Sequence, residues 1–224
     1  MKGEIILALD VATPEKAKRF VSGLYPKIKT FKVGLQLFTL CGPEIIKFII
    51  GKRAEVFLDL KFFDIPNTVA NAVRQAVRLK VRMLTLHISG GEQMLKAAVD
   101  AAKKEAALAG VKKPLLIGVT VLTSQEARPE AILKMAKLGL ASGLDGVVCS
   151  AREAAYLRKK IKNKFYIITP GIRPAEAKAD DQKRVASAGA AIKAGSNFLV
   201  IGRPILEAAN PLQAAGDILS EIGE

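Results

Sequence analysis

The sequence is poor in the residues that most often build metal, redox and nucleic-acid sites. Tryptophan is absent, aromatic residues make up 5% of the chain, and there are one histidine and two cysteines. Cys41 and Cys149 have no cysteine or histidine nearby at ligand spacing, so we expect neither a structural zinc site nor a disulfide framework. They are typical of free thiols in a cytoplasmic protein. The scarcity of aromatics also leaves no stacking platform for nucleic-acid bases.

Long apolar runs are missing as well. No uninterrupted apolar stretch reaches transmembrane length, and no apolar segment behind a basic head follows Met1, so we expect neither a membrane span nor a secretory signal. Acidic residues are outnumbered, with 21 Asp and Glu against 35 Lys and Arg, and the formal net charge is +14. This charge attracts polyanions, phosphorylated metabolites and acidic membranes alike. Because no nucleic-acid motif accompanies it, we interpret most of it as solvated surface.

What the sequence does have is a regular alternation of short apolar runs and amphipathic segments. The chain has 224 residues, of which 50% are hydrophobic, so it can bury a large core. The apolar runs predict strands at 4–10, 29–34, 54–60, 82–88, 115–122, 144–149, 164–169 and 197–202. Helical periodicity predicts helices at 14–25, 43–51, 66–79, 91–109, 128–141, 151–161, 185–194 and 204–221. Residues 35–42 leave room for an extra turn before the second of these helices.

This alternation predicts a (β/α)8 barrel. Near-continuous apolar strands separated by helices favour parallel pairing with right-handed crossovers, and eight such units close into a barrel. No linker or low-complexity segment interrupts the pattern, so we expect residues 1–224 to form a single domain. A doubly wound open sheet is the alternative fold.

Several charged residues lie where burial disfavours them. Active sites of (β/α)8 barrels form at the C-terminal ends of the strands. Asp10 ends the first predicted strand and Lys32 lies late in the second. Asp59 and Lys61 end the third, where the two-residue period of a strand places them on the same face, and Asp64 follows on the loop. A solitary salt bridge would explain any one of these charges, but several on one rim favour a functional site.

The loops after the seventh and eighth predicted strands favour an anion site. Residues 169–174 read Thr-Pro-Gly-Ile-Arg-Pro, and residues 201–204 read Ile-Gly-Arg-Pro. Glycine leaves backbone N–H groups accessible, Arg203 adds a planar cation, and phosphate is commonly bound at these loops in this fold. Glycine and proline that simply end strands are the alternative. Residues 171–184 are charged and aperiodic, which fits either a lid or a plain solvated loop.

The run from Asp59 to Thr68, Asp-Leu-Lys-Phe-Phe-Asp-Ile-Pro-Asn-Thr, resembles the signature of orotidine 5′-phosphate decarboxylases. Further segments match that family in order along the whole chain: 7–10, 31–34, 123–124, 169–174, 181–182 and 201–205. Each match is weak alone, but together they are highly specific. The resemblance implies decarboxylation of orotidine 5′-phosphate to uridine 5′-phosphate in pyrimidine biosynthesis, by a homodimer that uses no cofactor and no metal.

The resemblance also implies residue roles. Lys61 would protonate C6 as carbon dioxide leaves, Asp59 would face the substrate carboxylate, and Lys32 would bridge toward Asp59. Asp10 and Lys32 would bind ribose hydroxyls. The remaining implied residues are Asp64 and Thr68, which reach into the neighbouring subunit's site, Ser124 at the pyrimidine, Gln182 on the lid, and Pro170, Gly202 and Arg203 at the phosphate. We interpret His87, the sole histidine, as a structural residue rather than a base.

Two rival functions are also compatible with the sequence. A magnesium-dependent sugar-phosphate decarboxylase or aldolase of the same superfamily shares the Asp-x-Lys-x-x-Asp pattern and would stabilise an enediolate with its metal. Residues 65–68, 169–174 and 181–182 fit the nucleotide enzyme better. The second rival, a barrel that binds nucleic acid or another polyanion, is motivated by the charge of +14 alone.

Overall fold

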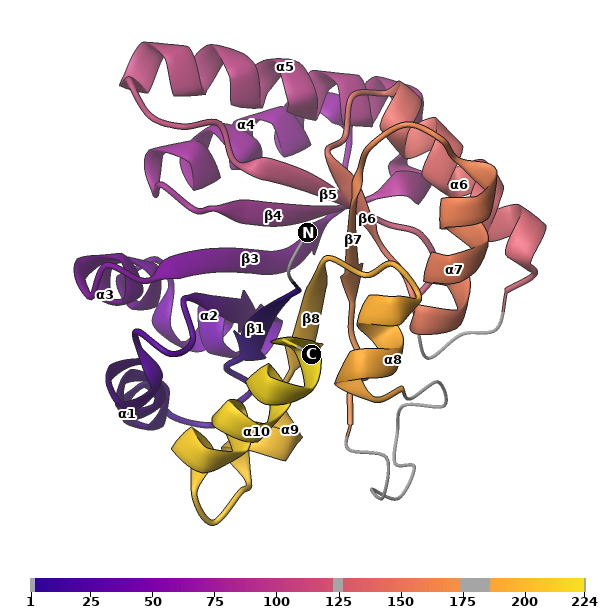
Figure 1. The fold of residues 1–224 in the computed structure, drawn as a ribbon. Helices are drawn as coiled ribbons and strands as arrows, with labels where there is room; N and C mark the ends of the chain where they lie inside the picture. Colours follow the sequence, from indigo (N-terminus) through magenta and orange to yellow (C-terminus); the bar gives the residue numbers. More distant parts are fainter. Residues whose placement is uncertain (1–2, 123–126, 174–185, 224) are drawn as a thin grey trace.

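The computed structural model describes residues 3–122, 127–173 and 186–223, which form a closed barrel of parallel strands surrounded by helices (Figure 1). Each strand pairs with the next along the chain, and β8 pairs with β1. The predicted (β/α)8 barrel is therefore confirmed, and the open-sheet alternative is wrong. The strands are β1 (Glu4–Ala8), β2 (Thr30–Gly34), β3 (Glu55–Phe62), β4 (Met83–His87), β5 (Leu115–Val119), β6 (Gly146–Val148), β7 (Tyr166–Thr169) and β8 (Phe198–Ile201).

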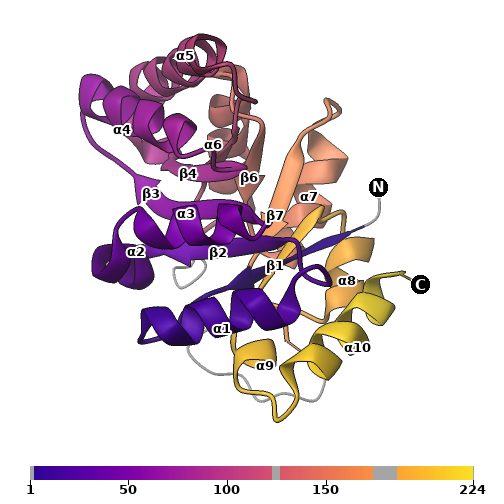
Figure 2. The same cartoon turned by 90° about the vertical axis from the view of Figure 1, so that its left-hand side faces the viewer.

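The helices lie outside the strands, with α1 next to α10 (Figure 2). No helix of the described residues is both long and apolar enough to cross a membrane. The helices are α1 (Pro14–Leu24), α2 (Leu35–Cys41), α3 (Glu44–Gly51), α4 (Pro66–Arg78), η1 (Ile88–Gly90), α5 (Gly91–Ala109), α6 (Pro129–Ala141), α7 (Ala151–Lys160), α8 (Ala188–Lys193), α9 (Arg203–Leu206) and α10 (Pro211–Gly223).

The prediction of a single continuous helix over residues 204–221 was wrong. Residues 204–221 are divided between α9 and α10, because Pro211 disfavours helical backbone at the residue before it. Asn210 instead caps the new helix, and its Oδ1 accepts a hydrogen bond from the Gln213 N–H at 3.1 Å. The room left at 35–42 is filled by a full helix, α2.

The core has two layers that follow the alternation of the strands. Inside the barrel, one cluster joins buried side chains from β1, β3, β4, β5, β7 and β8, namely Ile6, Phe57, Met83, Ile117, Ile168 and Phe198. The next residue along β1, Leu7, belongs to the larger cluster between strands and helices. Successive side chains of a strand point to opposite faces, which explains this division. The interior cluster forms a floor above which polar residues are placed.

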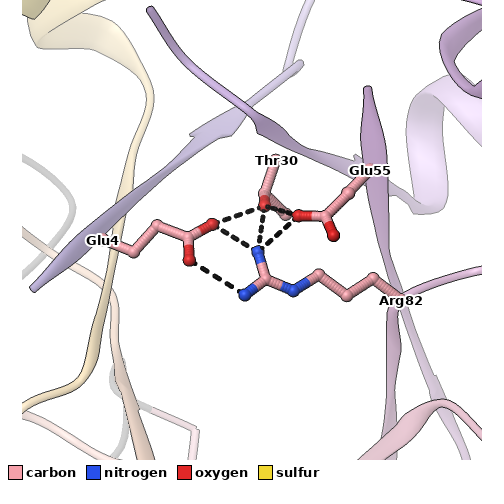
Figure 3. A network of polar contacts seen from close by, with 4 residues as sticks. All are labelled: Glu4, Thr30, Glu55 and Arg82. Carbon is pink, nitrogen blue, oxygen red and sulfur yellow. Dashed lines mark hydrogen bonds and ion pairs between the residues drawn. The ribbon is translucent and has the colours of Figure 1, made fainter. Parts of the chain in front are cut away.

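A polar network closes the N-terminal end of the barrel (Figure 3). Glu4, Thr30 and Glu55 are the first residues of β1, β2 and β3, and Arg82 directly precedes β4. The Arg82 Nη1 contacts Glu4 Oε1 and lies 2.7 Å from Glu55 Oε2, and Nη2 donates to Glu4 Oε2 at 2.9 Å. Thr30 Oγ1 lies among them, 2.6 Å from Arg82 Nη1. One guanidinium thus joins four neighbouring elements.

We expect Arg82→Met to lower the free energy of unfolding by about 2 kcal/mol, because the Glu4 and Glu55 carboxylates would face each other without their shared cation. Chemical denaturation at neutral pH would measure the loss. Lys112→Met, which removes an exposed charge at the same end of the barrel, is the control. Equal stability of the two variants would contradict a stabilising role for the network.

Candidate active site

The end of β3 carries the centre of the site. Lys61 has a φ of +52° although it lies within a strand, and the pairing of β3 with β4 shifts register between Leu58 and Phe62. This irregularity is a bulge, which re-aims the side chains around it. Lys61 Nζ lies 3.0 Å from Asp59 Oδ1. Regular alternation predicted that these two residues meet, but the bulge is what determines their geometry.

Four side chains of alternating charge stand in a row across β1, β2 and β3. Lys32 Nζ donates to Asp10 Oδ1 at 3.0 Å and lies 3.6 Å from Asp59 Oδ2, and Lys61 holds the other oxygen of Asp59. Lys32 is central to β2, whereas Asp10 lies two residues beyond the end of β1, so the first predicted strand was too long. The side chains of Lys32 and Asp59 are 11% and 13% exposed. Such buried charges persist only when they are paired.

The two lysines keep Asp59 ionised. Burial would raise the pKa of the Asp59 carboxyl, but the charges of Lys32 and Lys61 and hydrogen bonds from Lys61 and Thr85 outweigh burial, so its pKa lies below the ordinary value. The row therefore holds an ionised carboxylate between two lysine side chains at the C-terminal end of the barrel.

The row lines one side of a cavity of about 570 Å³ at the C-terminal ends of the strands. Small-molecule sites commonly have this size. Pro170, Gly202 and Arg203, which the sequence predicted at an anion site, line the same cavity. A Cβ added to Gly202 would lie 3.9 Å from Asp10 Oδ2, so the two halves of the predicted site adjoin here. Lys16 and Glu207 also line the cavity, although no sequence motif pointed to either residue.

The other predicted site residues stand apart. Asp64 and Thr68 are exposed and do not line the cavity, and Asp64 Oδ1 accepts a hydrogen bond from the Ile65 N–H at 2.6 Å. Ser124, Gln182 and all but the first three residues of the predicted lid at 171–184 lie outside the described residues. Within the part of the chain that the structure describes, no group of three or more His, Cys, Asp or Glu side chains is arranged to hold a metal ion.

Sequence reasoning missed Thr85, in the middle of β4. Its Oγ1 donates to Asp59 Oδ1 at 3.0 Å and accepts a hydrogen bond from the Lys61 backbone N–H at 2.9 Å. The available signal was a lone hydroxyl in the apolar run Met-Leu-Thr-Leu-His, two residues after Met83 of the interior core. Two residues further, the ring of His87 packs against Phe63 with centroids 5.7 Å apart. Burial lowers the pKa of His87, and Lys61 lowers it further, so the imidazole is neutral at neutral pH.

A closed (β/α)8 barrel with paired charges around a cavity at the C-terminal ends of its strands has the architecture of a barrel enzyme. The chain belongs to the orotidine 5′-phosphate decarboxylase / HUMPS family, whose model matches residues 3–218. The orotidine 5′-phosphate decarboxylase of Hydrogenovibrio crunogenus is 45% identical over 231 residues, which cover 98% of this chain and 96% of the relative. That of Coxiella burnetii is 44% identical over 230 residues, with coverage of 98% and 96%.

Solved structures agree with this assignment. The crystal structure of orotidine 5′-phosphate decarboxylase from Lactobacillus acidophilus has a TM-score of 0.85 to this chain at 35% identity, and covers 99% of this chain and 100% of that one. The corresponding structure from Pyrococcus horikoshii has a TM-score of 0.78 at 26% identity, with coverage of 98% and 99%.

Proposed function

We propose that this chain decarboxylates orotidine 5′-phosphate to uridine 5′-phosphate, without a cofactor, in pyrimidine biosynthesis. The observation that carries the proposal is the row Asp10, Lys32, Asp59 and Lys61 in one cavity with Arg203. Membership of the family supports it. The proposal treats residues 1–224 as one catalytic domain and places the reaction in the cytoplasm, in keeping with the free thiols of Cys41 and Cys149.

The chemistry explains why a lysine is needed at the reacting carbon. When the bond from C6 to the carboxylate breaks, its electron pair stays on C6, where the pyrimidine ring delocalises it poorly. Lys61 would stabilise this charge as an ammonium group and then transfer a proton from Nζ to C6. Asp59 Oδ1 lies 3.0 Å from this Nζ and so holds the proton donor in position.

Asp59 would have a second effect on the substrate. In the proposed pose its carboxylate faces the carboxylate that is lost, and like-charge repulsion would raise the energy of the bound substrate relative to the transition state. Lys32 lies 3.6 Å from Asp59 Oδ2 and holds the carboxylate in place. Lys32 on one side and Lys61 on the other thus fix the position of the Asp59 carboxylate.

The rest of the cavity would bind the nucleotide. Asp10 and Lys32 would hydrogen-bond the ribose hydroxyls, while Arg203, Gly202 and the loop at Pro170 would hold the phosphate. Ser124 at the pyrimidine and Gln182 on the lid complete the proposal, on the resemblance alone.

The proposal is tested by following the absorbance of orotidine 5′-phosphate with purified protein in excess chelator. We expect rapid conversion to uridine 5′-phosphate that added Mg²⁺ does not change. A magnesium-dependent sugar-phosphate enzyme would instead leave orotidine 5′-phosphate intact and lose its own activity in chelator. Conversion that stops in chelator and returns with Mg²⁺ would contradict the metal-free mechanism.

We also propose that the active form is a homodimer in which Asp64 and Thr68 complete the partner's site. Both are exposed and stand outside the cavity of their own chain. Next to Asp64, the apolar side chains of Phe63 and Ile65 are 61% and 66% exposed. Large apolar side chains gathered on a surface are typical of protein interfaces, and these would be covered by the second subunit.

A shared site predicts complementation between two inactive variants. In a mixed dimer of Lys61→Ala and Asp64→Ala subunits, one site would have both substitutions and the other would have neither. Random reassembly should therefore restore about a quarter of the wild-type activity per subunit. Activity assays after unfolding and refolding the variants together would measure it, with each variant refolded alone as the control. A mixture that exchanges subunits yet remains inactive would contradict cross-subunit catalysis by Asp64.

A further inference from the structure

We propose that Thr85 is a positioning residue that fixes Lys61 against Asp59 for proton transfer. This inference rests on the proposed function, because it concerns how the proton donor of that reaction is aimed. Thr85 lies on β4 with 1% of its surface exposed, and it does not line the cavity. It would act through its two neighbours on β3 without touching the substrate.

The Thr85 hydroxyl uses both of its hydrogen-bonding capacities on these neighbours. Its proton is donated to Asp59 Oδ1 at 3.0 Å, and its oxygen accepts the Lys61 N–H at 2.9 Å. Lys61 Nζ donates to the same Asp59 oxygen at 3.0 Å. The three residues therefore form a closed ring of hydrogen bonds, which ties the backbone of Lys61 to the carboxylate that holds its side chain.

The backbone of Lys61 needs such an anchor. A φ of +52° is disfavoured for any residue with a Cβ, and a strained conformation persists only where its surroundings impose it. The other described residues of this kind, Arg53 and Lys80, lie in turns, whereas Lys61 lies inside a strand. The register shift between Leu58 and Phe62 interrupts the ladder to β4 at this point. The Thr85 oxygen takes the place of a strand carbonyl as acceptor for the Lys61 N–H.

The same hydroxyl supports the charge of Asp59. Lys32 on β2 and Lys61 on β3 face this carboxylate, Thr85 and His87 lie on β4 beside them, and Asp10 faces Lys32 from beyond β1. Thr85 donates its hydroxyl hydrogen bond to the carboxylate without adding a charge. Removing its hydroxyl should raise the pKa of Asp59 while leaving both lysines in place.

The test compares Thr85→Val, which keeps the shape and loses the hydroxyl, with Thr85→Ser, which keeps the hydroxyl. We expect Val to lower kcat for orotidine 5′-phosphate by about 100-fold with little change in KM, because a misplaced catalytic group slows chemistry more than binding. Ser should restore most of kcat. The acid limb of the kcat/KM profile should move to higher pH in the Val variant only. Thr30→Val, which removes a buried hydroxyl at the far end of the barrel, is the matched control.

A second measurement, which needs no substrate, tests whether Thr85 anchors the backbone of Lys61. Hydrogen exchange of the Lys61 amide, followed by NMR, should be faster in Thr85→Val than in wild type and in Thr85→Ser. Unchanged exchange and unchanged kcat in the Val variant would overturn the proposal, as would equal losses of kcat in the Val and Ser variants. Wild-type protein that leaves orotidine 5′-phosphate intact would instead refute the proposed function, and the amide exchange would still decide whether Thr85 anchors Lys61.

Discussion

Lys61→Ala is expected to lower kcat for orotidine 5′-phosphate by about 10⁵-fold, because it removes both the proton donor and the cation nearest to the developing charge. The residual rate would come from binding and from Lys32, which the structure holds between Asp10 and Asp59. Loss of substrate absorbance, measured with chelator present and over hours for the variant, gives both rates. Lys112→Ala, which removes an exposed lysine at the opposite end of the barrel, should match wild type.

This result is interpretable only if the barrel survives the substitution. The Lys61 side chain contacts Asp59 and faces the cavity, so its removal empties no part of the apolar core. We expect the far-ultraviolet circular dichroism of the variant to match wild type. A folded Lys61→Ala protein with kcat within tenfold of wild type would exclude Lys61 as the proton donor.

The fold was predictable because each strand of a covered barrel is apolar on both faces, which makes the alternation with helices visible in the sequence. The ends of the strands were less predictable. The fifth run was expected to continue to residue 122, yet β5 ends at Val119 and pairs with β6 only from Ile117 onward. Apolar side chains continue past the last strand pairing because Val121 and Leu122 line the cavity.

The charge row was predictable because its members interrupt otherwise apolar strands. Lys32 and Asp59 are charges within apolar strands, and burial makes such residues conspicuous. Thr85 was not conspicuous, because β-branched residues are favoured in strands whether or not their hydroxyl is used. Only the register shift of β3 shows that its oxygen receives the Lys61 N–H.

The cross-subunit roles of Asp64 and Thr68 depended on the resemblance alone. Hydrophobic periodicity indicates which face of a strand or helix is buried, but it does not tell where a loop side chain points. Asp64 follows the end of β3 by two residues, yet it faces solvent and bonds its own neighbour, Ile65. Sequence spacing would have grouped it with Asp59 and Lys61, whereas the structure separates it from them by placing it outside the cavity.

The two ends of the barrel use charge differently. At the N-terminal end, Arg82 forms ion pairs with Glu4 and Glu55, and these ion pairs link the starts of β1 and β3. At the C-terminal end, Lys61 and Lys32 share Asp59 above an open cavity. The second arrangement has charged groups that line a cavity, so we expect substitutions there to change turnover more than stability.

Removing the phosphate from the substrate should have the second large effect. We expect orotidine to be decarboxylated with a kcat/KM at least about 10⁴-fold below that of orotidine 5′-phosphate, and with a lower kcat as well. The proposed phosphate contacts at Gly202 and Arg203 are remote from the reacting carbon near Lys61, so they can accelerate the reaction only by organising the charged half of the cavity. Gly202 lies close to Asp10, the first member of the row, which gives the two halves a direct connection.

Arg203→Ala separates this effect from a general loss of binding. With orotidine 5′-phosphate, the variant should lose about 100-fold in kcat/KM, because a charge-assisted contact to the phosphate is gone. With orotidine, which has no phosphate to hold, wild type and variant should react equally. The measurement is the steady-state kcat/KM of wild type and of Arg203→Ala, each with orotidine 5′-phosphate and with orotidine. If the variant loses as much with orotidine as with the nucleotide, Arg203 acts on the fold of the site and not on the phosphate. Equal kcat for both substrates in wild type would show that phosphate binding contributes nothing to the chemical step.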